Sequence, residues 1–147
     1  MSKTFEYTHM VFATKGRKHT ISLLHRQKLI DYLMTLLREL DCFVYQINAM
    51  PDHVHMFFDK NKHMPTEDIA RIVKGKASYW MRRCGDFPKF EAWGKEYFAG
   101  SISAWDKDMI SGYIANQDKH HGNMTFVDEM KRLYAAAGLP WHDNDMA

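Results

Sequence analysis

The alternation of apolar and polar positions changes its period several times along the chain. Period-two alternation in short stretches rich in aromatic and β-branched residues predicts strands, because successive side chains of a strand point to opposite faces. Apolar residues spaced by three and four, as in "LLHRQKLIDYLMTLLREL", predict amphipathic helices. The pattern predicts strand, helix, strand, strand, helix, strand and two further helices, over residues 7–15, 23–40, 42–50, 53–59, 66–83, 96–105, 107–121 and 126–137.

This order of elements predicts the fold class. A β-α-β-β-α-β chain is typical of the α+β, ferredoxin-like or RRM-like fold, an antiparallel sheet with helices on one face. The first strand and the strand over residues 53–59 commonly lie side by side at the centre of such a sheet. We therefore expect a helix-free sheet face that is open to a ligand. In the strand over residues 42–50, alternation places Phe43, Tyr45 and Ile47 on one face.

Composition narrows the class of protein. A chain of 147 residues with 46% hydrophobic and 26% charged residues predicts a single globular domain, residues 1–147. The net charge of +2 does not by itself indicate a nucleic-acid-binding protein. The two cysteines, Cys42 and Cys84, are too few for a disulfide framework or a zinc cluster, which favours reduced thiols. No apolar run approaches the length of a membrane helix, so we expect a soluble cytoplasmic protein with no membrane partner.

Two histidines stand one residue apart in "PDHVHMFF". If this stretch is a strand, His53 and His55 project from one face, while Val54, Met56 and Phe58 face the other. A His-x-His pair on a strand offers two nitrogens to one divalent ion. Two surface histidines on an open sheet face would explain the dipeptide equally well.

A second candidate lies in "SGYIANQDKHH". Tyr113 and Gln117 are four residues apart on a predicted helix and therefore share one face. Two imidazoles and an amide oxygen would suit Mg²⁺ or Mn²⁺ bound to a phosphate oxygen, with the tyrosine as a nucleophile on phosphorus. The alternative is a buried tyrosine with a glutamine partner. His120 is a rival ligand, although the helix dipole alone favours a histidine near a helix C-terminus.

The other histidines and the basic residues give weaker signals. Five histidines show no spacing relation to the candidate site and receive no role: His9, His19, His25, His63 and His142. Basic residues gather after the first strand and along the second long helix, where they are compatible with phosphate contacts, a solvated helix face being the alternative. These candidate DNA-binding residues are Lys15, Arg17, Lys18, Lys74, Lys76, Arg82 and Arg83.

Four motifs together carry a family resemblance: "MPDHVHMFF", "IVKGKASYW", "WGKEYFAGSIS" and "YIANQ". The chain resembles, over nearly its whole length, the single-tyrosine HUH transposases of small bacterial insertion sequences, the IS-two-hundred-like and IS-six-hundred-and-five-like group. The resemblance implies that His53 and His55 bind a divalent metal, that Tyr113 is the nucleophile and that Gln117 is the third ligand. It assigns Asp52 only a supporting role.

The resemblance also implies an activity. Such transposases cut and rejoin single-stranded DNA through a 5′-phosphotyrosine intermediate, recognise hairpins at the element ends and form homodimers. The implied cofactor is Mg²⁺ or Mn²⁺, with no nucleotide cofactor, and the implied location is the bacterial cytoplasm.

Alternatives from other classes stay open at this point. One is a non-catalytic RRM-like nucleic-acid-binding module, since the sheet topology is shared. Another is a metal-dependent nuclease that uses an activated water and in which Tyr113 is only structural. A regulator or toxin descended from a transposase is a third. A covalent protein–DNA adduct would distinguish the transposase from the nuclease, whereas an RRM-like module would need exposed aromatic residues on the two central strands.

Overall fold

One four-stranded antiparallel sheet organises the chain, whose computed structural model describes residues 1–147. The spatial order is β2-β3-β1-β4, so β1 and β3 form the centre. Each strand pairs antiparallel with its neighbour. The strands are β1 (Tyr7–Thr14), β2 (Phe43–Met50), β3 (His53–Asp59) and β4 (Trp93–Ser101). This arrangement confirms the predicted ferredoxin-like fold.

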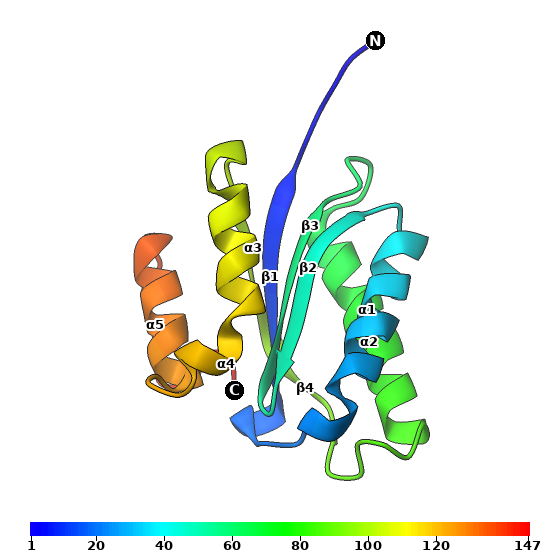
Figure 1. Ribbon diagram of the computed structural model, residues 1–147, viewed down its shortest axis with the longest axis vertical. Helices are drawn as coiled ribbons and strands as arrows, with labels where there is room; N and C mark the ends of the chain where they lie inside the picture. The colour runs from blue at the N-terminus through cyan, green and yellow to red at the C-terminus, as the bar shows by residue number, and fades with distance from the viewer.

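Helices cover both faces of this sheet. Figure 1 shows α1 and α2 on one side, and α3, α4 and α5 on the other. No helix has the length and apolar character needed to span a membrane. The helices are α1 (Arg26–Glu39), α2 (Thr66–Arg83), α3 (Lys107–Ala115), α4 (Gln117–His120) and α5 (Phe126–Ala136), with short 3-10 turns at Lys15–Arg17, Leu23–His25 and Ala104–Asp106.

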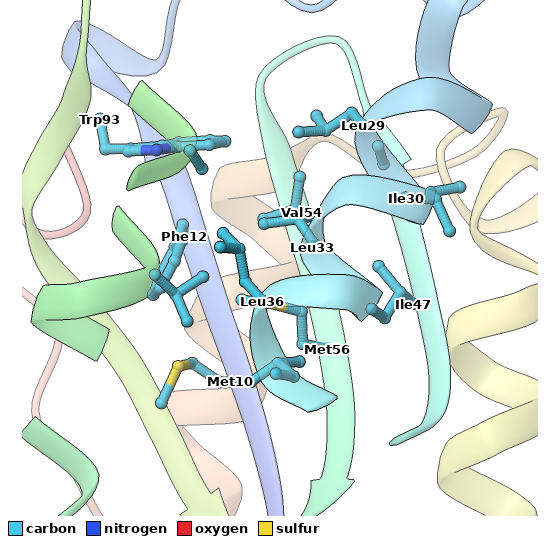
Figure 2. Close-up of a cluster of buried hydrophobic side chains, with 14 of the residues drawn as sticks. Met10, Phe12, Leu29, Ile30, Leu33, Leu36, Ile47, Val54, Met56 and Trp93 are labelled. Carbon is cyan, nitrogen blue, oxygen red and sulfur yellow. The ribbon is translucent and has the colours of Figure 1, made fainter. Parts of the chain in front are cut away.

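The larger apolar core lies between the sheet and the helices α1 and α2. It contains 22 buried residues, among them Met10 and Phe12 from β1 and Val54 and Met56 from β3 (Figure 2). Burying each large side chain of this kind stabilises the fold by roughly 1.5–3 kcal/mol. This core fixes the central strands and therefore the positions of the side chains on their opposite face.

The strand β2 departs from the predicted alternation. A bulge interrupts its pairing with β3 between Val44 and Gln46, and an extra residue on one strand shifts the following side chains to the other face. Ile47 lies opposite Met56 and joins the larger core, whereas Tyr45 contacts the aromatic rings of the other sheet face. The prediction that Phe43, Tyr45 and Ile47 share one face was therefore wrong.

The second sheet face is covered, which corrects the expectation of an open face. The helix α5 begins after Thr125, whose hydroxyl accepts a hydrogen bond from the amide of Asp128, as expected of a residue that caps a helix N-terminus. Its apolar stripe, with Phe126 and Met130, packs on the sheet in a cluster of seven buried residues. Apolar residues at helical spacing need such a partner surface, and here the sheet face supplies it.

The predicted helix over residues 107–121 is interrupted. It divides at Asn116 into α3 and α4, because Asn116 has backbone angles (φ −98°, ψ 23°) outside the helical region. The predicted strand over residues 96–105 is also displaced, since β4 begins at Trp93 and ends at Ser101. Neither change separates Tyr113 from Gln117, whose side-chain amide lies 3.4 Å from the Tyr113 carbonyl oxygen.

Candidate metal and nucleophile site

The His53 and His55 side chains lie next to each other on β3, as their spacing predicted. Their ring centroids are 5.0 Å apart and both side chains are fully buried. Nδ1 of His53 lies 2.6 Å from a carboxylate oxygen of Asp52, and Nδ1 of His55 lies 2.8 Å from Nε2 of His9. Partners on one ring nitrogen fix the orientation of an imidazole and direct the other nitrogen, here Nε2 of both rings, into the site.

His9 belongs to this group, although the sequence analysis gave it no role. It stands on β1 opposite Phe57, which lies two residues from His55 on the same face of β3. Its ring stacks on that of His55 with centroids 5.1 Å apart. The two histidines meet only because of the register between β1 and β3, and the spacing of residues along the chain does not reveal that register.

A carboxylate from α5 lies at the centre of the site. Oε1 of Glu129 is 3.3 Å from Nε2 of His53, 3.2 Å from Nε2 of His55 and 3.0 Å from Nε2 of His121. Glu129 is only 1% exposed. The sequence analysis missed both Glu129 and His121. The one available signal for Glu129 was its helical spacing from Phe126 and Met130, which placed it near the buried side of a helix.

Gln117 and Tyr113 reach the same carboxylate from α4 and α3. The Gln117 amide donates to Oε2 of Glu129 over 2.9 Å, and its own oxygen lies 3.3 Å from Nε2 of His53. The Tyr113 hydroxyl donates to Oε2 of Glu129. The structure therefore brings together all four residues that the sequence singled out. His120 instead packs against the Tyr113 ring, with centroids 4.8 Å apart.

Burial and charge shift the acidities of these groups. Burial lowers the pKa of His55, and burial together with His55 lowers the pKa of His9 to about 3. Burial also acts against the charged form of His53, but the Asp52 and Glu129 carboxylates outweigh it and raise the pKa of that imidazole. Burial and the neighbouring Glu129 raise the pKa of Tyr113 above its ordinary value. Tyr113 is therefore a neutral phenol at neutral pH.

Glu129 is the acidic member of this network. Burial opposes its ionisation, but hydrogen bonds from His121, His53 and His55 hold its pKa well below the usual range. The group is therefore a carboxylate that faces the ring nitrogens.

The donor atoms of this site suit a divalent metal. Ligand atoms of His53, His55 and Glu129 all lie within 4.8 Å of one another, and the Gln117 oxygen is adjacent. Imidazole nitrogens with carboxylate and amide oxygens form a mixed set that accepts ions such as Mn²⁺ or Mg²⁺. The residues present therefore fit the metal that the sequence analysis expected.

The candidate DNA-binding residues lie apart from this network. Lys15, Arg17 and Lys18 follow the end of β1 that pairs with His53, whereas the other four lie on α2, across the sheet. Arg17 donates to the carbonyl oxygens of Asp143 and Asp145, and the Lys74 ammonium donates to the Gly94 carbonyl oxygen over 2.7 Å. The exposed members are Lys15, Lys18, Lys76, Arg82 and Arg83.

A ferredoxin-like sheet with a buried histidine pair and an adjacent helical tyrosine is the arrangement that the resemblance to single-tyrosine DNA transposases implies. Residues 3–117 match the family described as "Transposase IS200 like". The chain therefore belongs to the IS200-like transposase family, and as a member it is a DNA transposase. Comparison with curated protein sequences returned no match.

Two solved structures have the same fold. One, from Deinococcus radiodurans R1 and assigned as a transposase, is 21% identical with a TM-score of 0.63, over 79% of this chain and 93% of that chain. The other is a REP-associated tyrosine transposase bound to a REP hairpin. It is 15% identical with a TM-score of 0.60, over 100% of this chain and 94% of that chain. The family match includes Tyr113 and Gln117 but ends before α5, which carries Glu129.

Proposed function

We propose that this transposase cuts and rejoins single-stranded DNA, with Tyr113 as the nucleophile and a divalent metal held by His53, His55 and Gln117. The observation that carries the proposal is that side chains from distant segments of the chain converge on one point. The histidines on β3 and the tyrosine on α3 come from distant segments, yet Tyr113 packs against His55 with ring centroids 5.9 Å apart and shares a carboxylate with it. A tyrosine with only a structural role would not require two imidazoles whose Nε2 atoms face the same carboxylate as its hydroxyl.

The side chains have separate tasks in this proposal. Asp52 and His9 orient the imidazoles, so that their Nε2 atoms and the Gln117 oxygen form the metal-binding side of the site. A bound divalent ion supplies positive charge that offsets the charge of the scissile phosphate. Tyr113 is held by its hydrogen bond to Glu129, which limits the positions its oxygen can take.

The covalent step exchanges one phosphodiester for another. The Tyr113 oxygen forms a bond to phosphorus, the bond between phosphorus and the 3′ oxygen breaks, the phenol releases its proton and the 3′ oxygen gains one. The products are a 5′-phosphotyrosine and a free 3′-hydroxyl. Because the phosphodiester is retained, a 3′-hydroxyl of another strand can reverse the step and join new ends without a nucleotide cofactor.

A hairpin-bearing DNA strand is the proposed substrate. The REP-associated neighbour is bound to a hairpin, and the family resemblance implies the same kind of substrate. We also propose that Tyr113 acts in the chain that carries its histidines, because one chain holds all four residues in contact. The homodimer and the bacterial cytoplasm stay predictions from the resemblance.

The test is capture of DNA by the purified protein. A 5′-hairpin-bearing, fluorescently labelled single strand is incubated with Mn²⁺ or Mg²⁺ and run on a denaturing gel. We expect a covalent protein–DNA band with the wild-type protein, none with Tyr113→Phe, and an undiminished band with Tyr79→Phe, an exposed tyrosine on α2. Cleavage without a covalent band would instead indicate a nuclease that uses water. An adduct formed by Tyr113→Phe would disprove the assignment of the nucleophile.

Mixing two inactive variants tests whether the site is complete in one chain. If Tyr113 acts beside its own histidines, Tyr113→Phe mixed with His55→Ala should remain inactive. Recovery of up to about a quarter of the adduct, the fraction of reconstituted sites expected for random exchange between two protomers, would show that the tyrosine acts on the partner's metal site.

A further inference from the structure

Glu129 is the one buried acidic side chain of the protein. Burial of a carboxylate is costly unless hydrogen bonds or opposite charges compensate it. Four of the five polar side chains around Glu129 belong to the proposed site, namely the imidazoles of His53 and His55, the Gln117 amide and the Tyr113 phenol, and the fifth is His121. The position of the carboxylate is therefore tied to the function of the site and not to packing alone.

The spacing of the donor atoms would allow them to share one ion. Two ligands that each lie about 2.1 Å from one ion are roughly 3.0–3.4 Å apart, for octahedral or tetrahedral angles respectively. Oε1 of Glu129 is 3.3 Å from Nε2 of His53 and 3.2 Å from Nε2 of His55. Since Asp52 engages Nδ1 of His53, the Nε2 atom that faces Glu129 is the one available for a metal.

The second argument comes from the helix that carries this residue. The helix α5 begins nine residues after the family match ends at residue 117 and is otherwise held by apolar contacts. At its first turn Phe126 stacks on the His53 ring, with centroids 4.3 Å apart. One end of α5 therefore covers the histidine pair, and Glu129 reaches into the site one turn later.

We propose that Glu129 is a ligand of the metal, supplied by α5, and that metal binding fastens α5 over the histidine pair and Tyr113. This inference rests on the proposed function for the presence of the metal, and it adds a ligand from outside the segment that the family match covers. A carboxylate that instead occupies the place of the metal would have to leave when the ion binds. The two arrangements predict opposite changes in metal affinity.

The experiment measures Mn²⁺ affinity by the loss of the free-ion signal in electron paramagnetic resonance. Glu129→Gln keeps the shape and one acceptor oxygen but removes the charge and the second acceptor. Its Mn²⁺ affinity should fall by at least about tenfold to a hundredfold, the range seen when even outer-shell partners of a metal site are lost. Asp128→Asn makes the same charge change at the exposed neighbouring position and should stay within about twofold of wild type. Unchanged or tighter binding by Glu129→Gln would overturn the proposal, and tighter binding would identify the carboxylate as a competitor of the ion.

Hydrogen exchange gives a readout of the coupling to α5. Mn²⁺ should slow amide exchange across Phe126–Ala136 in the wild-type protein and in Asp128→Asn, but not in Glu129→Gln. Equal slowing in all three proteins would contradict the role of Glu129 in fastening the helix. If Glu129→Gln does not fold, Glu129→Asp provides the second variant. It keeps the charge on a shorter side chain, and full wild-type affinity in that variant would again count against a ligand.

The outcomes separate this inference from the proposed function. If wild-type protein forms the covalent DNA adduct and Glu129→Gln binds Mn²⁺ as wild type does, only the inference about Glu129 fails. If no adduct forms but the substitution weakens Mn²⁺ binding, the ligand assignment stands and the proposed strand transfer fails.

Discussion

The two faces of the sheet are stabilised in different ways. Against α1 and α2, 22 buried residues form an apolar core, whereas against α3, α4 and α5 only seven apolar residues surround a buried polar network. Apolar packing depends mainly on shape and volume. A buried polar network depends on every member keeping its partner and its charge. The first face should therefore provide stability under most conditions, and we expect the stability of the second face to depend on pH and on bound ions.

The strand β3 carries both kinds of surface in alternate residues. Val54, Met56 and Phe58 are fully buried in the apolar core, while His53 and His55 are fully buried in the polar network. Packing on one side removes freedom from the backbone that holds the histidines on the other. The comparison predicts that neighbouring substitutions on this strand have separable effects.

The largest effect on stability should come from the apolar face. Phe58→Ala should lower the free energy of unfolding by about 3–5 kcal/mol, because it removes a large buried side chain and leaves a cavity. Urea unfolding followed by circular dichroism measures this change. Leu24→Ala, at a position 87% exposed, is the control and should change it by less than about 0.5 kcal/mol. A loss below 1 kcal/mol for Phe58→Ala would show that the core can collapse around the cavity.

The converse substitution lies three residues away, on the opposite face of β3. His55→Ala should abolish measurable Mn²⁺ binding and adduct formation while lowering the free energy of unfolding by only about 1–3 kcal/mol, the cost of leaving Nε2 of His9 unpaired and of removing one of the partners of Glu129. Calorimetric titration with Mn²⁺ and urea unfolding on the same preparation check both parts. A stability loss as large as that of Phe58→Ala would mean that the two faces are not separable.

Acid should weaken the polar face selectively. The pKa of His9 is lowered to about 3 by burial and by His55, whereas in the unfolded chain it is near the ordinary 6.5. The unfolded state therefore binds a proton that the folded state does not, and stability is lost as the pH falls from 6.5 towards 3, by about 1.4 kcal/mol per pH unit from this residue.

His9→Gln provides the matched measurement, since an amide can still pair with His55 but does not titrate. Urea unfolding with a chelator present, between pH 7 and pH 4, should show a shallower loss of stability in the variant by about that slope. Parallel curves for the two proteins would show that His9 is protonated in the folded state as readily as in the unfolded chain.

The sequence could predict the parts of the site that lie within one element. Period two placed His53 and His55 on one face, and helical spacing placed Gln117 beside Tyr113, so both pairs follow from local geometry. The order of elements was enough to predict the ferredoxin-like sheet. These features need no knowledge of tertiary contacts.

The remaining features depend on tertiary contacts. His9 reaches His55 only through the register between β1 and β3, and Glu129 only through the docking of α5. The bulge in β2, which sends Tyr45 to the site face, has no glycine or other recognisable signal in "FVYQINAM". Because the docking of α5 was not foreseen, the histidine face was expected to be open.

The smallest predicted effects come from two aromatic stacks, one on each side of the sheet. Tyr32 of α1 stacks on Trp80 of α2 with centroids 4.4 Å apart, and Phe126 of α5 stacks on His53 with centroids 4.3 Å apart. Replacement of either Tyr32 or Phe126 by Leu keeps an apolar side chain and should cost roughly 0.5–1.5 kcal/mol of stability. Only Phe126→Leu should also weaken Mn²⁺ binding, because the His53 ring loses the surface that restrains it. The loss of affinity should be less than about tenfold, the smallest effect expected when a hydrogen-bond partner of a metal ligand is removed. Equal Mn²⁺ affinities in the two variants would mean that Asp52 alone orients His53, since its hydrogen bond to Nδ1 remains in both.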